Sequence, residues 1–179
     1  MGSARYVPSL LLALSGCGGA KPPPAIPGDA APIPYTAEQI RDACPPGSTR
    51  IFRIEEVGQP VLRNIIRFVA ATPEEAEIEI AVTDESGLEA EPTKRERVPW
   101  EKLRQHAAFP RARTTITDET VATPAGTFAV KMYVVQGDGD QVKRFAFAKS
   151  LPGPPVMYAT DKGGIRVMTS TLVSTESRR

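Results

Sequence analysis

The sequence predicts an α+β fold, in which a curved, half-barrel-like antiparallel β-sheet meander carries two short helices. Apolar and polar residues alternate with period two through most of residues 50–173, as they do in strands with one buried and one wet face. The segments between these runs are short and rich in glycine and proline, which favours hairpins over parallel crossovers. Helix signals occur only at Thr36 and Pro99.

The first predicted helix begins after Thr36. Thr36 and Gln39 form a capping-box pattern, in which each side chain satisfies a backbone amide of the other residue. The Pro-Pro-Gly run at 45–47 ends this helix. Ile40 and Cys44 share one side at four-residue spacing, so we expect Cys44 to be a buried thiol. An intermolecular disulfide and a catalytic nucleophile are the alternatives.

The clearest strand prediction covers residues 77–82. Ile78, Ile80 and Val82 should face the core, while Glu77 and Glu79 face water. Turn-forming residues at 58–60, 124–126, 137–140 and 161–164 favour sequential antiparallel pairing. The further strands are predicted at 50–55, 61–69, 114–123, 127–135, 142–148, 156–160 and 165–173.

A second helix is predicted between the strand at 77–82 and the strand at 114–123. It starts at Pro99, places Leu103 and Ala107 on one face, and is closed by Pro110. The basic cluster at 94–97 just before it is interrupted by one glutamate and balanced by two more, at 89 and 91. We interpret this cluster as the solvated face of a strand, and we expect no nucleic-acid partner.

The amino terminus carries an export pattern. Arg5, the apolar run at 7–14 and the small residues Ser15 and Gly16 precede Cys17. The run Leu14-Ser15-Gly16-Cys17 resembles the lipobox of bacterial lipoproteins. That resemblance implies that residues 1–16 are a cleaved signal peptide and that Cys17 is lipidated and acylated, with palmitate as one such chain. An ordinary thiol in an unstructured terminus is the alternative.

The lipobox resemblance also implies a location. A lipid on Cys17 would make the membrane the partner of this chain, at the periplasmic face of a bacterial membrane. Gly18, rather than aspartate, after the cysteine resembles the sorting state of outer-membrane lipoproteins. We therefore expect a protein anchored by lipid to the outer membrane and exposed to the periplasm.

The segment that follows the cysteine is predicted to be a tether. Residues 17–34 contain six prolines and little that could form a core, so this segment should extend over roughly 50 Å as a polyproline-like spacer. Residues 35–173 then form one antiparallel domain, and residues 174–179 form a disordered tail. Without the signal peptide, whose only charged residue is Arg5, basic and acidic residues are equal in number, at 21 of each.

The predicted domain resembles known envelope proteins in its architecture. A one-sided antiparallel sheet with helices that can cover its concave face is similar to the half-barrels of the lipoprotein-localisation carriers LolA and LolB. The segments 120–128 and 144–156 also resemble parts of uncharacterised bacterial envelope proteins. Neither resemblance brings a known catalytic residue.

Catalytic and metal-binding motifs are missing from the sequence. The single histidine, His106, is interpreted as a surface or packing residue, and the pair Asp138 and Asp140 as part of a hairpin turn. No nucleophile elbow, phosphate-binding loop or histidine pair is present. We therefore expect no catalytic residue, no metal and no cofactor, and no enzymatic activity. A hydrolase that uses carboxylates from separate strands stays open as a second alternative.

Two functions of different classes remain. In the first, the protein is a structural or protein-interaction factor that docks another envelope protein, and its apolar residues form an ordinary core. In the alternative, an apolar groove binds a lipid, an acyl chain or a client lipoprotein. An apolar cavity open to solvent would favour the carrier, whereas a filled interior would favour docking. The residues proposed for the groove are Trp100, at its mouth, and Phe128, Val130, Met132, Phe145 and Phe147.

Overall fold

The computed structural model describes residues 29–177, which form a nine-stranded antiparallel sheet, two short α-helices and one 3-10 turn. The curved antiparallel architecture with two short helices is confirmed, although the domain is mostly β because the helices are so short. The elements are α1 (Ala37–Ala43), β1 (Ser48–Glu56), β2 (Leu62–Ala71), β3 (Glu75–Asp84), β4 (Glu89–Pro99), α2 (Trp100–Gln105), η1 (Arg111–Arg113), β5 (Thr114–Thr123), β6 (Gly126–Gln136), β7 (Gln141–Ala148), β8 (Met157–Lys162) and β9 (Ile165–Ser177).

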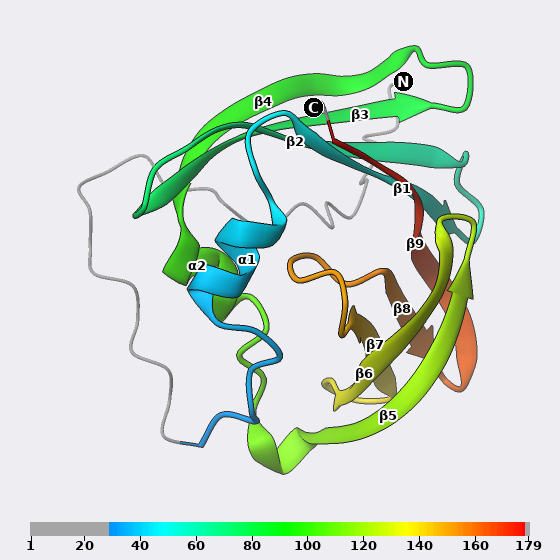
Figure 1. Ribbon diagram of the computed structural model, residues 1–179. Helices are drawn as coiled ribbons and strands as arrows, with labels where there is room; N and C mark the ends of the chain where they lie inside the picture. The colour runs from blue at the N-terminus through cyan, green and yellow to red at the C-terminus, as the bar shows by residue number, and fades with distance from the viewer. Residues whose placement is uncertain (1–28, 178–179) are drawn as a thin grey trace.

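The sheet consists of two meanders that share one junction. The strand order is β4-β3-β2-β1-β9-β8-β7-β6-β5, so β1–β4 form one meander, β5–β9 form the other, and β1 pairs with β9 between them. Residues 100–113, with α2 and η1, carry the chain from the β4 edge to the opposite edge at β5. Figure 1 shows that the sheet curves around both helices, which lie on its inner side.

The period-two pattern of β3 buries one set of alternate side chains, as the sequence predicts. Ile78, Ile80 and Val82 are buried in β3, and the first two belong to the hydrophobic core. On the other face, Glu77 lies 2.7 Å from a guanidinium nitrogen of Arg95 on β4. Charged cross-strand pairs of this kind hold two neighbouring strands in register while their side chains stay wet.

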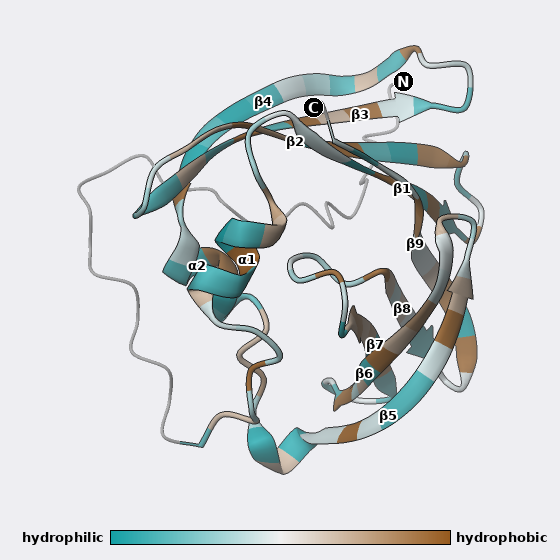
Figure 2. Cartoon of the chain, in the orientation of Figure 1, coloured by the Kyte–Doolittle hydropathy of each residue, from teal (hydrophilic) through white to brown (hydrophobic). Residues whose placement is uncertain are grey.

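Strand β4 was not among the strands that the sequence predicts, although its basic cluster was interpreted as a strand face. Most of its residues are exposed on both sides, with the buried Val98 near its end. Figure 2 shows β4 as largely hydrophilic. An edge strand with two wet faces has no apolar alternation, so periodicity cannot reveal it.

Both helix predictions are confirmed in position. The amide of Gln39 donates to the Thr36 hydroxyl at 3.1 Å and the Thr36 amide donates to the Gln39 side chain at 2.9 Å, which is the expected capping box. The second helix is shorter than expected, because Pro99 is its N-cap and the helical turn runs only from Trp100 to Gln105. Helices α1 and α2 contact each other across the inner side of the sheet.

The packed part of the chain is longer than residues 35–173. Ala31 is 3% exposed, its amide donates to the carbonyl of Phe109 at 2.8 Å, and the Tyr133 hydroxyl donates to the carbonyl of Pro32 at 2.6 Å. Residues 30–34, expected in the tether, therefore pack against the domain. Strand β9 continues through Ser177, into the expected tail. Cys17 and most of the expected tether lie outside the described residues.

Candidate functional site

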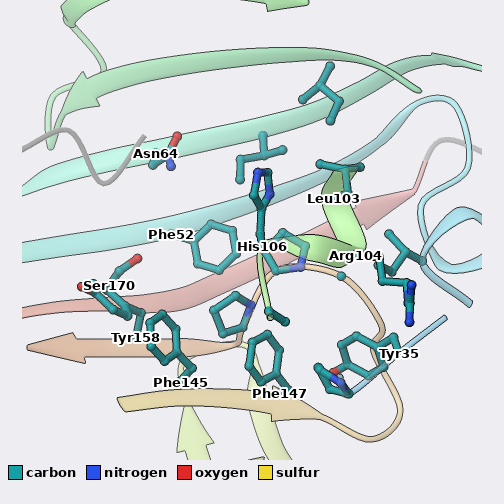
Figure 3. A pocket seen from close by; sticks show the side chains of 18 of the residues that line it. Tyr35, Phe52, Asn64, Leu103, Arg104, His106, Phe145, Phe147, Tyr158 and Ser170 are labelled. Carbon is teal, nitrogen blue, oxygen red and sulfur yellow. The ribbon is translucent and has the colours of Figure 1, made fainter. Parts of the chain in front are cut away.

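An apolar pocket of about 350 Å³ lies between the inner face of the sheet and the helices (Figure 3). This volume falls in the range of small-molecule sites. Exposed His106 is among the lining residues, so the pocket reaches the surface beside α2. The lining residues are Ile33, Pro34, Tyr35, Ile40, Phe52, Asn64, Ile66, Phe68, Ile78, Ile80, Leu103, Arg104, His106, Ala107, Phe145, Phe147, Gly153, Pro154, Pro155, Tyr158 and Ser170.

One wall of the pocket comes from alternate residues of three neighbouring strands. Ile66 on β2 is paired with Ile80 on β3, and Phe68 is paired with Ile78, so these four side chains share the inner face. Phe52 on β1 extends the same wall. All five residues are buried. This wall is therefore a continuous hydrocarbon surface made by the period-two pattern.

The opposite wall is aromatic and comes from β7 and β8. Phe145 is paired with Tyr158, and their ring centroids are 4.8 Å apart. Phe109, from the crossover segment, stacks on Phe145 at 4.6 Å. Phe147 meets the edge of Tyr35 at 6.0 Å. Such aromatic contacts make a rigid wall, since offset and edge-on rings gain energy beyond their buried area.

The helix side of the pocket is lined by α2 and the residues that follow it. Leu103 of α2 and Ala107, two residues past the end of this helix, both line the pocket, whereas the sequence predicts them on one face of a longer helix. His106 and Arg104 add polar groups at this side. Partial burial of the exposed His106 side chain lowers its pKa below the ordinary value, and the charge of Lys102 lowers it further.

A buried arginine holds the loop that forms the remaining side. Arg50 on β1 is 3% exposed, and its Nη2 donates to the carbonyl of Pro152 at 2.6 Å and to that of Ala43 at 3.4 Å. The same nitrogen lies 3.3 Å from the Sγ of Cys44. Burial lowers the pKa of Arg50 and raises the pKa of Cys44. Because the guanidinium contacts both α1 and the loop, it ties these two parts to the sheet.

Gly153 passes close to this arginine. Its φ is +126°, and a Cβ atom built on it would lie 2.7 Å from the Nη1 of Arg50. Within the described part of the chain, that nitrogen is buried and has no hydrogen-bond partner. Glycine is therefore required at this position both by the backbone conformation and by the space available.

The structure brings together only part of the groove predicted from the sequence. Phe145 and Phe147 line the pocket, whereas Trp100, Phe128, Val130 and Met132 do not. Met132 is paired with Ala146, which alternates with the two phenylalanines along β7, so residues 128, 130 and 132 lie on the opposite face of the sheet.

Trp100 lies behind the pocket rather than at its mouth. It is 2% exposed, its ring stacks on Phe68 with centroids 6.2 Å apart, and its indole nitrogen donates to the carbonyl of Thr72 at 2.9 Å. The wall residues of β1–β3 were not proposed for the groove, although their alternation marks them as core-facing. Their role in ligand binding, like that of the predicted set, stays a prediction.

Two further sequence interpretations concern isolated residues. Cys44 is a buried free thiol, as expected from its position in the first helix. Asp138 lies in the turn between β6 and β7, where Arg113 donates to it at 2.9 Å. Within residues 29–177, no cluster of three or more potential metal-ligating side chains occurs. In the same range, no helix has both the length and the apolar character needed to cross a bilayer.

Comparison with known proteins yields a likeness of fold. No family model and no curated protein matches the chain. The structure is similar to a chain in the complex of Pseudomonas aeruginosa MucA and MucB, with a TM-score of 0.50 and 6% sequence identity. The match covers 74% of this chain and 53% of the other, so this chain spans about half the length of the protein that it matches. At this identity, the likeness concerns the fold alone.

We predict that Gly153→Ala destabilises the domain more than Gly87→Ala. Both residues have positive φ, and a side chain in such a conformation costs about 1–3 kcal/mol, but nothing lies near a Cβ atom at Gly87. The added methyl at Gly153 should also displace Arg50 from its carbonyl partner, which costs about 1.5–3 kcal/mol more. Urea unfolding of the two variants measures the difference. Equal losses would show that the contact with Arg50 contributes nothing.

We also predict that acidification weakens the fold through His106. A lowered pKa means that the unfolded chain takes up the proton first. The stability that depends on neutral His106 is fully present above about pH 6.5, the ordinary histidine pKa, and it declines as the pH falls through the lower pKa of the folded protein. The free energy of unfolding of His106→Gln should therefore decrease less than that of the wild type over this range. Parallel curves for the two proteins would contradict the prediction.

Proposed function

We propose that this domain binds the apolar chain of an amphiphile in the pocket and acts as a carrier or chaperone for it. The observation that carries this proposal is the open cavity of about 350 Å³, whose lining is mainly aliphatic and aromatic. A filled interior would have favoured plain core packing. The resemblance of the predicted architecture to half-barrel carriers supports the same class of function.

The size of the pocket sets what it can hold. If a water-sized group takes about 30 Å³, the cavity has room for roughly a dozen non-hydrogen atoms. About ten buried CH₂ groups contribute roughly 8 kcal/mol, while association costs at least about 4 kcal/mol. A hydrocarbon chain alone would then bind weakly, so contacts to its polar head should decide the affinity.

A second candidate function is docking of an envelope protein. Strands β4 and β5 form the two edges of the sheet, so each has a row of backbone groups without a neighbouring strand. An extended segment of a partner can add to such an edge. The structure with a similar fold was solved as a complex of two proteins, which supports this candidate. The pocket lining contains no aspartate or glutamate, so the hydrolase alternative gains no support from it.

The carrier proposal predicts quenching of Trp100, the single tryptophan of the chain. Its ring stacks on Phe68, which lines the pocket, so a bromine-labelled medium-chain alcohol inside the pocket should quench its fluorescence saturably. Leu103→Glu places a charge in the pocket and should weaken binding about tenfold or more, because a charge in apolar surroundings loses its hydration. Fluorescence titration of the full chain measures the affinity of the wild type and that of the Leu103→Glu variant.

Leu88→Glu is the matched control for this experiment. Leu88 is 70% exposed and does not line the pocket, so the same substitution there should leave the affinity unchanged. Absence of saturable quenching in the wild type would exclude the carrier proposal. Equal weakening by both variants would place the binding site elsewhere.

We further propose that lipid on Cys17 anchors the protein at the periplasmic face of the outer membrane. The lipobox-like run before Cys17 supports this proposal. Cys17→Ser should move the protein from the membrane fraction to the soluble fraction, because the thioether lipid can no longer form. Cys44→Ala, which changes the buried thiol at the C-cap of α1, should stay in the membrane fraction. Immunoblotting of the two fractions measures this, and a membrane-bound Cys17→Ser variant would exclude the anchor.

A further inference from the structure

We infer that the pocket selects an uncharged amphiphile, whose hydroxyl or primary amide head lies against Asn64 and Ser170 while its chain extends toward the helices. This inference rests on the proposed binding of an apolar chain, and it specifies the chemical class of the ligand.

Asn64 is the main observation behind this inference. It lines the pocket from β2, and its Oδ1 is buried and has no hydrogen-bond partner within residues 29–177. Its cross-strand neighbours are Phe52 on β1 and Val82 on β3, both buried and apolar. A buried amide oxygen without a partner destabilises a protein, since it has lost its hydrogen bonds to water. A ligand reaches this oxygen when the side chain turns toward the pocket, and the hydrogen bond formed there would remove this cost.

Two hydroxyl groups lie toward the same end of the pocket. Ser170 on β9 is 7% exposed and lines the pocket. It is paired with Ile54, two residues along β1 from the partner of Asn64. Tyr158, paired with Ser170, accepts a hydrogen bond from Thr160 at 2.9 Å and keeps its own proton to donate. Figure 3 shows Asn64, Ser170 and Tyr158 on the same side of the pocket.

The charges around the pocket favour a neutral head. The arginine in the lining is Arg104, which comes from α2 and is paired with Glu101 at 2.5 Å, while Arg50 lies behind Gly153 on the loop side. Figure 3 shows Arg104 on the side away from Asn64 and Ser170. A carboxylate or ammonium at the Asn64 end would lose its hydration without gaining an opposite charge. A hydroxyl both donates and accepts, so it suits an amide and a serine together.

The test compares two probes that share one chain, a medium-chain alcohol and the corresponding carboxylate at pH 7. Each displaces the bromine-labelled alcohol from the full-length protein, and recovery of Trp100 fluorescence reports its affinity. We expect the alcohol to bind about tenfold more tightly than the carboxylate, which corresponds to one net hydrogen bond. Asn64→Leu should weaken alcohol binding about tenfold and leave carboxylate binding within about twofold.

Control variants separate recognition from folding. Asn64→Leu should melt at or above the wild-type temperature, because it removes a buried amide oxygen without a partner. Ser170→Ala should also weaken alcohol binding, whereas Ser174→Ala, on the same strand but outside the lining, should not.

The outcomes distinguish the inference of a neutral head from the carrier proposal on which it rests. Equal or tighter binding of the carboxylate overturns the inference of a neutral head and leaves the carrier proposal standing. Equal weakening of both probes by Asn64→Leu also overturns it, because the amide would then act on the shape of the pocket alone. If neither probe binds, the carrier proposal fails together with this inference.

Discussion

The inner face of the curved sheet is larger than the area that the helices and loops packed against it can cover. Alternate residues of β1–β3 and β7–β9 make this face apolar, and apolar surface exposed to water is unfavourable by roughly 25 cal/mol per Å². The cover consists of two helices of 7 and 6 residues, the segment before α1 and the loop before β8. The pocket is the part of the inner face that this cover leaves open, so its existence follows from the balance of sheet and helix.

The few fixed points of the cover explain why the pocket keeps its shape. Arg50 reaches from β1 to the carbonyls of Ala43 and Pro152, and the Tyr35 hydroxyl donates to the carbonyl of Ala148 at 2.6 Å. Burial raises the pKa of Tyr35, so this phenol stays protonated and donates across the physiological pH range. These hydrogen bonds attach the segments on the helix side to different strands. The cover is therefore held to the sheet at these points.

The strands could be predicted from the sequence because alternation is a local property. Residues 77–82 show their buried face without reference to any neighbour, and the capping box at Thr36 needs only four residues. The groove could not be predicted in the same way. Whether Met132 and Phe147 share a face depends on the pairing of β6 with β7, and a shift of one residue in register moves a whole set of side chains to the other face.

Asn64 shows another limit of sequence reasoning. A single asparagine within a predicted strand carries no signal of its own, since its meaning comes from the apolar neighbours that other strands bring to it. The β4 edge was also hidden, because its two exposed faces give no apolar alternation. The packing of residues 30–34 was hidden because it depends on contacts far along the chain.

The pairing of β1 with β9 imposes an order on folding. Strand β1 begins at Ser48, and its partner there is Ser177, so the first and last strands along the chain pair over the whole length of β1. The first meander can assemble early in synthesis, but its junction with the second requires β9, which is made more than a hundred residues after β1. Until then, one side of β1 is an unpaired edge, and contacts of such long sequence separation slow folding and prolong exposure to aggregation. Strand β9 is therefore the closing element of the domain.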